Sequence, residues 1–166
     1  LGGDDTAAGN LIAHNGRNGV TVFCCADNRI TANAIYSNTQ LGIDLVPADG
    51  SLGVTANDTG DGDSGGNGLQ NFPVLASAAG ASSITVTLNS AASTLYRLEF
   101  FAGDGCDAGG YGEGERLIDT ITLMTNSGGH VQFSQNVAAV PDGTALTATA
   151  TRLSATPVGG QTYGST

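Results

Sequence analysis

Residues that can offer an oxygen ligand occupy every second position of a short glycine-rich stretch. This stretch is the best candidate in the chain for a functional site. Asp61, Asp63, Gly65 and Asn67 are separated by single residues, and Asp58 precedes them. Carboxylates, a backbone carbonyl and an amide oxygen on one loop can surround a hard cation, and Ca²⁺ takes about six to eight oxygen ligands. We therefore predict a calcium site formed by Asp58, Asp61, Asp63, Gly65 and Asn67.

This spacing resembles the first half of an EF-hand calcium loop, but the match is partial. The bidentate Glu that an EF-hand places at about the twelfth position has no counterpart here. A solvated acidic linker is the alternative interpretation of the same residues. A second acidic stretch, residues 104–115, contains several glycines, and for it we favour structural turns over a second ion.

Residues suited to acid-base catalysis are sparse. Asp44, His14 and Arg17 have side chains suited to catalysis and lie in the two repeats described below. They do not make the pair of carboxylates that glycoside hydrolysis needs. The sequence also has no pattern for a Ser/His/Asp triad, a phosphate-binding loop or a zinc site. We interpret His14 and His130 as exposed turn residues, and Glu99 as a solvated residue on the outer face of a strand.

The segment before the acidic loop is built from a repeat, in which residues 10–22 return as residues 33–45. The matched positions are Asn10 and Asn33, Ile12 and Ile35, Asn15 and Asn38, Gly19 and Gly42, Val20 and Ile43, and Val22 and Leu45. Such a repeat indicates one supersecondary unit stacked on its copy. We expect the aliphatic residues to point inward on short strands, the asparagines to bond along the stack, and both glycines to take a positive φ at sharp corners. The alternative is an Asn- and Gly-rich loop region with two accidental hairpins.

Residues 10–22 and 33–45 resemble the repeats of secreted bacterial right-handed parallel β-helix proteins. Residues 1–10 resemble the segment that precedes such coils in this family, so we expect the chain to be a mature product or a fragment. Residues 68–75 resemble the junction at which a β-sandwich follows the last coils. The resemblance implies a secreted or cell-surface location. Because β-helices often act on polysaccharides, it also keeps an enzymatic origin open.

Segments with alternating apolar and polar residues follow the acidic loop at regular spacing. They predict six strands, in residues 74–78, 83–88, 96–102, 117–124, 131–136 and 145–152. This pattern is typical of an immunoglobulin-like sandwich, with Phe72, Tyr96, Phe100 and Phe133 as core residues and a last strand available only in residues 161–166. We therefore predict an all-β chain. It has a short right-handed parallel β-helix in residues 1–50, an acidic glycine-rich linker with the predicted calcium loop in residues 51–71 and an immunoglobulin-like β-sandwich in residues 72–166.

The charge of the chain argues against two classes of partner. Its formal net charge is -10 and its five basic residues are scattered arginines, so it offers no surface for the phosphates of nucleic acid or for an anionic membrane. No apolar run approaches the roughly 18 residues of a membrane-spanning helix. We predict no nucleic-acid binding and no membrane insertion.

The cysteines, Cys24, Cys25 and Cys106, are odd in number, so at least one thiol stays outside any intramolecular pairing. Adjacent cysteines rarely bond to each other. A bridge from either Cys24 or Cys25 to Cys106 is left open by the sequence.

We therefore predict a non-enzymatic extracellular structural or adhesive module that is stabilised by Ca²⁺. The repeat supplies about two and a half coils, fewer than the roughly three that a solenoid needs, so strand edges must be covered. Upstream β-helix coils, a second subunit or the following domain could cover them, and head-to-tail self-association would give fibres. The alternatives are the C-terminal fragment of a polysaccharide-acting β-helix enzyme and a carbohydrate-binding module for a cell-surface glycan.

Overall fold

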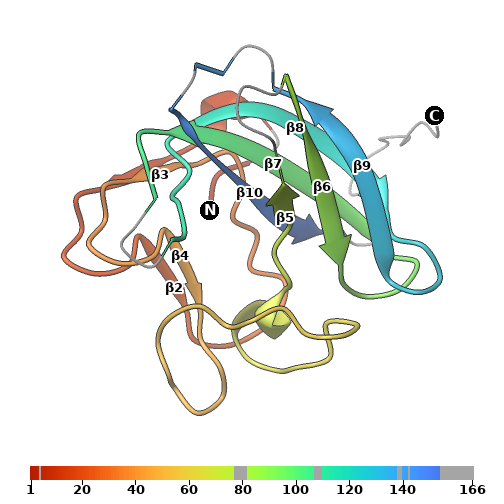
Figure 1. The fold of residues 1–166 in the computed structure, drawn as a ribbon. Coiled ribbons are helices and arrows are strands. Elements are labelled where there is room, and N and C mark those ends of the chain that lie inside the picture. The colour runs from red at the N-terminus through yellow and green to blue at the C-terminus, as the bar shows by residue number, and fades with distance from the viewer. Residues whose placement is uncertain (4, 77–81, 107–109, 138–139, 142, 154–166) are drawn as a thin grey trace.

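The computed structural model describes residues 1–153, except for residues 4, 77–81, 107–109, 138–139 and 142 (Figure 1). In this part the chain is all-β, and its only helical turns are the short 3-10 segments η1 (Thr6–Ala8) and η2 (Gly66–Leu69). The predicted all-β class is therefore confirmed. None of the helical segments described is long and apolar enough to cross a membrane.

The repeated residues form two short parallel pairs of strands. β1 (Leu11–Ala13) pairs with β3 (Ala34–Tyr36), and β2 (Val20–Val22) pairs with β4 (Ile43–Leu45). The chain returns to the same direction after each coil, which makes both pairings parallel. The predicted stacking of residues 10–22 on residues 33–45 is confirmed in its register, which pairs Ile12 with Ile35, Val20 with Ile43 and Val22 with Leu45.

Two asparagine ladders connect the coils. Asn10 donates from its backbone N and its Nδ2 to Asn33 Oδ1, at 3.0 and 2.9 Å. Asn15 donates in the same way to Asn38 Oδ1, at 3.1 and 2.8 Å. Each acceptor thus satisfies two donors of the coil before it, and the predicted stacking of amides is confirmed.

Position 19 requires a glycine because of close packing, and not because of its φ angle. A Cβ on Gly19 would lie 2.7 Å from the carbonyl oxygen of Gly42 and 2.7 Å from Cγ2 of Ile35. The left-handed backbone falls instead on His14 (φ 58°) and Ser37 (φ 53°), which are matched positions of the two coils. The predicted positive φ at Gly19 and Gly42 is therefore wrong.

Two three-stranded antiparallel sheets follow the linker (Figure 1). One sheet has the order β5 (Val74–Ala76), β6 (Ser83–Asn89), β9 (His130–Asn136), and the other has the order β10 (Ala145–Arg152), β7 (Leu95–Gly103), β8 (Arg116–Met124). All six predicted strands are present, with small differences at their ends. The last strand predicted in residues 161–166 lies outside the described residues.

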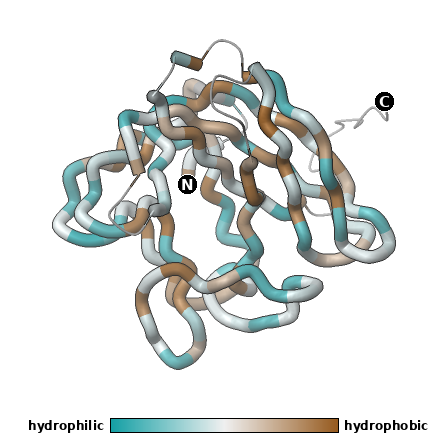
Figure 2. Tube along the Cα trace, viewed as in Figure 1, coloured by the Kyte–Doolittle hydropathy of each residue, from teal (hydrophilic) through white to brown (hydrophobic). Residues whose placement is uncertain are grey.

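The two sheets enclose one apolar core, and apolar and polar residues alternate along the strands (Figure 2). Tyr96 and Phe100 are buried in this core, as predicted, and Phe133 packs against it with its ring 6.5 Å from that of Phe100. Phe72 lies outside the core cluster. Its ring contacts Tyr111 edge to face at 6.1 Å, so its predicted place in the core is wrong. The core is filled mainly from β6 and β7, by Ile84, Val86, Leu88, Tyr96, Leu98 and Phe100.

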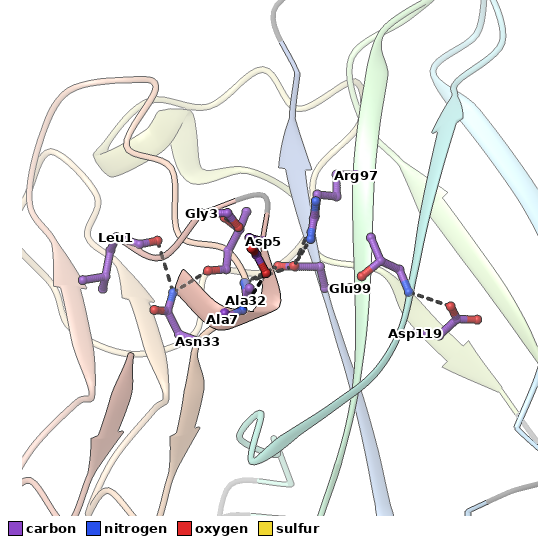
Figure 3. Close-up of polar contacts among 11 residues, drawn as sticks. Leu1, Gly3, Asp5, Ala7, Ala32, Asn33, Arg97, Glu99 and Asp119 are labelled. Carbon is purple, nitrogen blue, oxygen red and sulfur yellow. Dashed lines mark hydrogen bonds and ion pairs between the residues drawn. The ribbon is translucent and has the colours of Figure 1, made fainter. Parts of the chain in front are cut away.

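Glu99 on β7 is buried, with 1% of its surface exposed, which corrects the prediction of a solvated side chain. Its Oε1 accepts a hydrogen bond from Arg97 Nη2 at 2.8 Å, and both of its oxygens accept from the backbone N of Ala32, at 3.0 and 3.2 Å (Figure 3). The alternation along β7 does direct Glu99 away from the sandwich core. The prediction failed because the coil that contains Ala32 covers the outer face of β7.

The loop between β7 and β8 covers the second coil at another point. Glu113 Oε1 accepts from Asn38 Nδ2 at 2.7 Å, and Glu113 Oε2 accepts from the backbone N of Asn38 at 3.0 Å. The backbone N of Ile35 donates to the carbonyl oxygen of Gly114 at 2.7 Å. The Glu113 carboxylate thus stands where the next asparagine of the ladder would stand, and the loop between β7 and β8 covers this side of the coils.

Candidate metal centre

Asp58, Asp61 and Asp63 lie together in the linker between β4 and β5. One carboxylate oxygen from each residue lies within 4.8 Å of the other two, and all three side chains are half-buried. This arrangement brings three of the five predicted ligands to one point. Three carboxylates on one loop suit a divalent cation that prefers oxygen ligands.

Asp61 is fixed by hydrogen bonds to both of its carboxylate oxygens. Oδ1 accepts from the backbone N of Asn71 at 2.7 Å, and Oδ2 accepts from Ser90 Oγ at 2.7 Å. The backbone of Asp61 is left-handed, with a φ of 57°, a conformation that aspartate tolerates better than most residues. Both donors are neutral, so the negative charge of Asp61 stays available to a cation.

Asn71 attaches the acidic loop to the sandwich. Only 2% of Asn71 is exposed. Its Oδ1 accepts from the backbone N of Asp58 at 3.1 Å, while its Nδ2 donates to the carbonyl oxygens of Asp58 and Asn89, both at 2.8 Å. A buried amide with every polar atom paired holds its neighbours in fixed positions, so the backbone at Asp58 is fixed to the end of β6.

A second amide holds the start of the loop. Asn57 Nδ2 donates to the carbonyl oxygen of Phe72 at 2.8 Å, and Asn57 Oδ1 accepts from the backbone N of Phe72 at 2.9 Å. Sequence reasoning missed both Asn57 and Asn71. The available signal was the position of Asn71 within the predicted junction, residues 68–75, where a side-chain amide can pair backbone groups that have no strand partner.

Asp63 has an oxygen without a partner. Its Oδ1 is buried and forms no hydrogen bond with any described residue. Burial first, and then the negative charges of Asp58 and Asp61, raise the pKa of the Asp63 carboxyl above its ordinary value. Both causes disfavour the ionised form. A bound cation would offset both, because it supplies the missing partner and the opposite charge.

Gly65 and Asn67, the other two predicted ligands, make contacts of their own. Gly65 forms an antiparallel bridge with Pro47. Asn67 Oδ1 accepts from the backbone N of Asn28 at 2.9 Å, and its Nδ2 donates to the carbonyl oxygen of Asn28 at 2.7 Å. The Asn67 side chain thus fastens the turn after β2 to the linker. As metal ligands, Gly65 and Asn67 remain predictions.

A chain of hydroxyl groups connects the acidic loop with the core. Ser90 Oγ, which donates to Asp61, also lies 2.7 Å from Tyr96 Oη and accepts from Gln70 Nε2 at 2.9 Å. Because the single proton of Ser90 goes to Asp61, Tyr96 donates to Ser90. Ser90 and Tyr96 are buried at 1% and 0% exposure, so the position of Asp61 depends on the packed interior of the sandwich.

The residues considered for catalysis have other surroundings. Asp44 lies opposite Thr21, as the repeat predicts, but only 1% of it is exposed. It accepts from Asn18 Nδ2 at 2.7 Å and from the backbone N of Gly53 at 3.2 Å. These contacts give Asp44 a structural role at the start of the linker. His14 and His130 are both exposed, as predicted, but His130 is the first residue of β9 and not a turn residue.

No protein-family model matches this chain, and no curated protein matches its sequence.

Proposed function

We propose that this chain is an extracellular structural module in which coils of a right-handed parallel β-helix are followed by an immunoglobulin-like sandwich, and in which a Ca²⁺ ion stabilises the junction. Asp58, Asp61 and Asp63 bind the ion. The observation that carries the proposal is the buried Oδ1 of Asp63, which has no hydrogen-bond partner among the described residues and lies beside two further carboxylates. Backbone carbonyls and water complete the ligands.

The strand order supports the immunoglobulin-like part of this proposal. Connections from β6 to β7, from β8 to β9 and from β9 to β10 pass from one sheet to the other, while β5 to β6 and β7 to β8 stay within a sheet. This alternation of hairpins and crossings is typical of Greek-key sandwiches.

A structural role for the ion follows from the way its ligands are attached. Asp61 is bound to the core through Ser90 and Tyr96, and the backbone of Asp58 is bound to β6 through Asn71. An ion that needs this arrangement binds the folded chain and not the unfolded one. At a free concentration of about 100 times its Kd it would add about 2.7 kcal/mol of stability.

Thermal unfolding with and without calcium tests the proposal. The Tm of the full chain should rise on adding Ca²⁺ to chelator-treated protein and fall again with excess chelator. Asp63→Asn should abolish this response. Asp27→Asn is the matched control, since it removes the same charge at an exposed position outside the cluster, where the φ of 64° suits asparagine. A response that Asp63→Asn retains would overturn the assignment.

Self-association belongs to the same proposal. Among the described strands, β1 pairs only with β3 and β2 only with β4, so each has a free edge, and strand edges are sites of further pairing. Leu11, the first residue of β1, is 68% exposed, and Phe23, which follows β2, is 66% exposed. We propose that the free edge of the first coil pairs either with an upstream coil or, head to tail, with a second copy of this chain. Strictly monomeric sedimentation at high protein concentration with calcium would exclude the second copy.

Glycan binding is a second candidate, favoured by one observation. A cleft of about 1110 Å³ lies between the second coil, the linker and β10, and Tyr111 forms part of its wall. Tyr111 is 43% exposed and rests edge to face on Phe72, which holds its ring in place. Binding on a glycan array that Tyr111→Ala abolishes would support this function, and an array without signal would remove it.

A further inference from the structure

The two adjacent cysteines at the end of β2 lie on the same side of the chain. In an extended strand, consecutive side chains point to opposite faces, which keeps neighbouring thiols apart. β2 ends at Val22, however, and the backbone of Cys25 is left-handed, with a φ of 69°. As a result, Cys24 Sγ lies 2.7 Å from Cys25 Sγ.

Contacts from another segment hold this turn in its conformation. The carbonyl oxygen of Cys25 accepts from the backbone N of Asn67 at 2.7 Å. Asn28 Nδ2 donates to the carbonyl oxygens of Cys24 and Cys25, both at 3.3 Å. The backbone N and the carbonyl oxygen of Asn28 are both hydrogen-bonded to the side chain of Asn67. The approach of the two sulfurs therefore belongs to the folded chain and is fixed by the linker.

Both thiols are accessible and unbridged. Cys24, Cys25 and Cys106 are all exposed free cysteines, so the structure contains no bridge from the pair to Cys106. The hydrogen bond with Cys25, followed by the charge of Cys25, raises the pKa of the Cys24 thiol. Ionisation of the Cys24 thiol thus depends on its neighbour.

We propose that Cys24 and Cys25 form a reversible redox site, which closes to a disulfide between the two adjacent residues when a low-molecular-weight disulfide such as oxidised glutathione is present. The sulfurs need to approach from 2.7 Å to the roughly 2.05 Å of a disulfide bond. Exposed disulfides are the ones that exchange readily. This proposal does not rest on the proposed calcium site or on self-association.

The reaction proceeds in two exchange steps. The thiolate of one cysteine attacks a sulfur of oxidised glutathione, forms a mixed disulfide and releases one glutathione thiolate. The neighbouring thiolate then attacks the protein sulfur of the mixed disulfide, which forms the Cys24–Cys25 bond and releases the second glutathione. Two electrons pass from the cysteines to glutathione, and the two thiol protons end on the two glutathione molecules.

Tryptic mapping of the full chain tests this proposal directly. The chain has no lysine, and cleavage after Arg17, Arg29, Arg97 and Arg116 leaves both Cys24 and Cys25 in peptide 18–29 and Cys106 in peptide 98–116. The folded protein is incubated with oxidised glutathione, and remaining thiols are alkylated with iodoacetamide during denaturation. Peptide 18–29 should then be unlabelled and lighter by two hydrogen atoms. Treatment with dithiothreitol before alkylation should restore two labels on this peptide.

Two variants distinguish a disulfide between Cys24 and Cys25 from a disulfide that involves Cys106 and from a lasting mixed disulfide with glutathione. Cys106→Ser should leave the result for peptide 18–29 unchanged, whereas Cys25→Ser should leave glutathione attached to Cys24, because no neighbour can displace it. Melting curves verify that both variants fold. A cross-link between peptides 18–29 and 98–116, two labels after oxidation, or glutathione that stays attached to the natural pair would each overturn the proposal.

Discussion

The carboxylate of Glu113 accepts hydrogen bonds from both the backbone N and the Nδ2 of Asn38, at 3.0 and 2.7 Å, although 75 residues separate the two in the sequence. Asn38 in turn accepts two hydrogen bonds from Asn15. A charged residue of the sandwich therefore terminates a ladder of neutral amides. Hydrogen bonds to a charged group are stronger than those between neutral groups, so this contact should contribute strongly to the cohesion of coils and sandwich.

Glu113→Ala should destabilise the whole chain. Asn38 is 7% exposed. The variant leaves its backbone N–H without a partner and leaves its Nδ2 only the longer hydrogen bond to the carbonyl oxygen of Ile12, at 3.3 Å. This loss costs about 1.5 to 3 kcal/mol. Urea unfolding followed by circular dichroism measures the change. Glu115→Ala is the matched control two positions further on, and we expect a much smaller effect from it. Equal losses for the two variants would contradict the role of Glu113.

Glu99→Ala should cost more than Glu113→Ala. It removes the carboxylate that pairs with Arg97 at 2.8 Å and that accepts from the backbone N of Ala32, a residue only 8% exposed. Hydrogen bonds to a charged group contribute about 1.5 to 3 kcal/mol each, and Glu99 accepts from Arg97 Nε and Nη2 as well as from Ala32. Glu99→Gln keeps an acceptor for Ala32 and should lie between Glu99→Ala and the natural chain in urea unfolding. A loss below about 1 kcal/mol for Glu99→Ala would show that β7 does not need this contact.

These two glutamates also mark the limit of what the sequence predicts. Periodicity and the internal repeat were sufficient for the six strands and for the register of the coils, because both depend on residues close in the chain. Glu99 was misjudged because its outer face is covered by Ala32, which lies 67 residues away. A pattern along one strand gives the direction of a side chain, but it contains no information about which element packs there.

The candidate metal site was predictable to a similar extent as the fold. Alternating carboxylates on a glycine-rich loop identified Asp58, Asp61 and Asp63, because the ligands of a loop site are neighbours in sequence. The residues that hold the loop, Asn71 and Ser90, come from outside it. Their roles depend on how the linker packs on β6, which spacing alone does not determine.

Ser90→Ala should weaken both the fold and the calcium response. The variant removes the donor to Asp61 Oδ2 and leaves the buried hydroxyl of Tyr96 without its acceptor, at a cost of about 1 to 3 kcal/mol. Tyr96→Phe removes only the far end of the chain of hydroxyl groups, so it should destabilise the fold but retain most of the calcium-induced rise in Tm. Equal calcium responses in Ser90→Ala and the natural chain would contradict the positioning role of Ser90.

The pH dependence of stability without calcium should carry the signature of Asp63. Because its pKa in the folded chain is raised above the ordinary 3.8, the folded chain retains this proton to higher pH than the unfolded chain. Stability therefore falls as pH rises from about 3.8 through the raised pKa, and the loss is complete above it.

Asp63→Asn removes this loss, since it cannot ionise. In calcium-free buffer it should have a higher Tm than the natural chain at pH 7, and a similar Tm at pH 3, where Asp63 is protonated in both states. The comparison requires melting curves of the two proteins from pH 3 to pH 7. A lower Tm for Asp63→Asn at pH 7 without calcium would mean that its carboxylate already has a stabilising partner.

Calorimetric titration of Ca²⁺ into the chelator-treated full chain measures the proposed ion site itself. We expect one saturable binding event for the natural protein, the same event for Asp27→Asn, and no heat of binding above dilution for Asp63→Asn. Titration of the natural protein without any saturable heat, together with a Tm that calcium leaves unchanged, would contradict the metal centre and with it the calcium-stabilised junction.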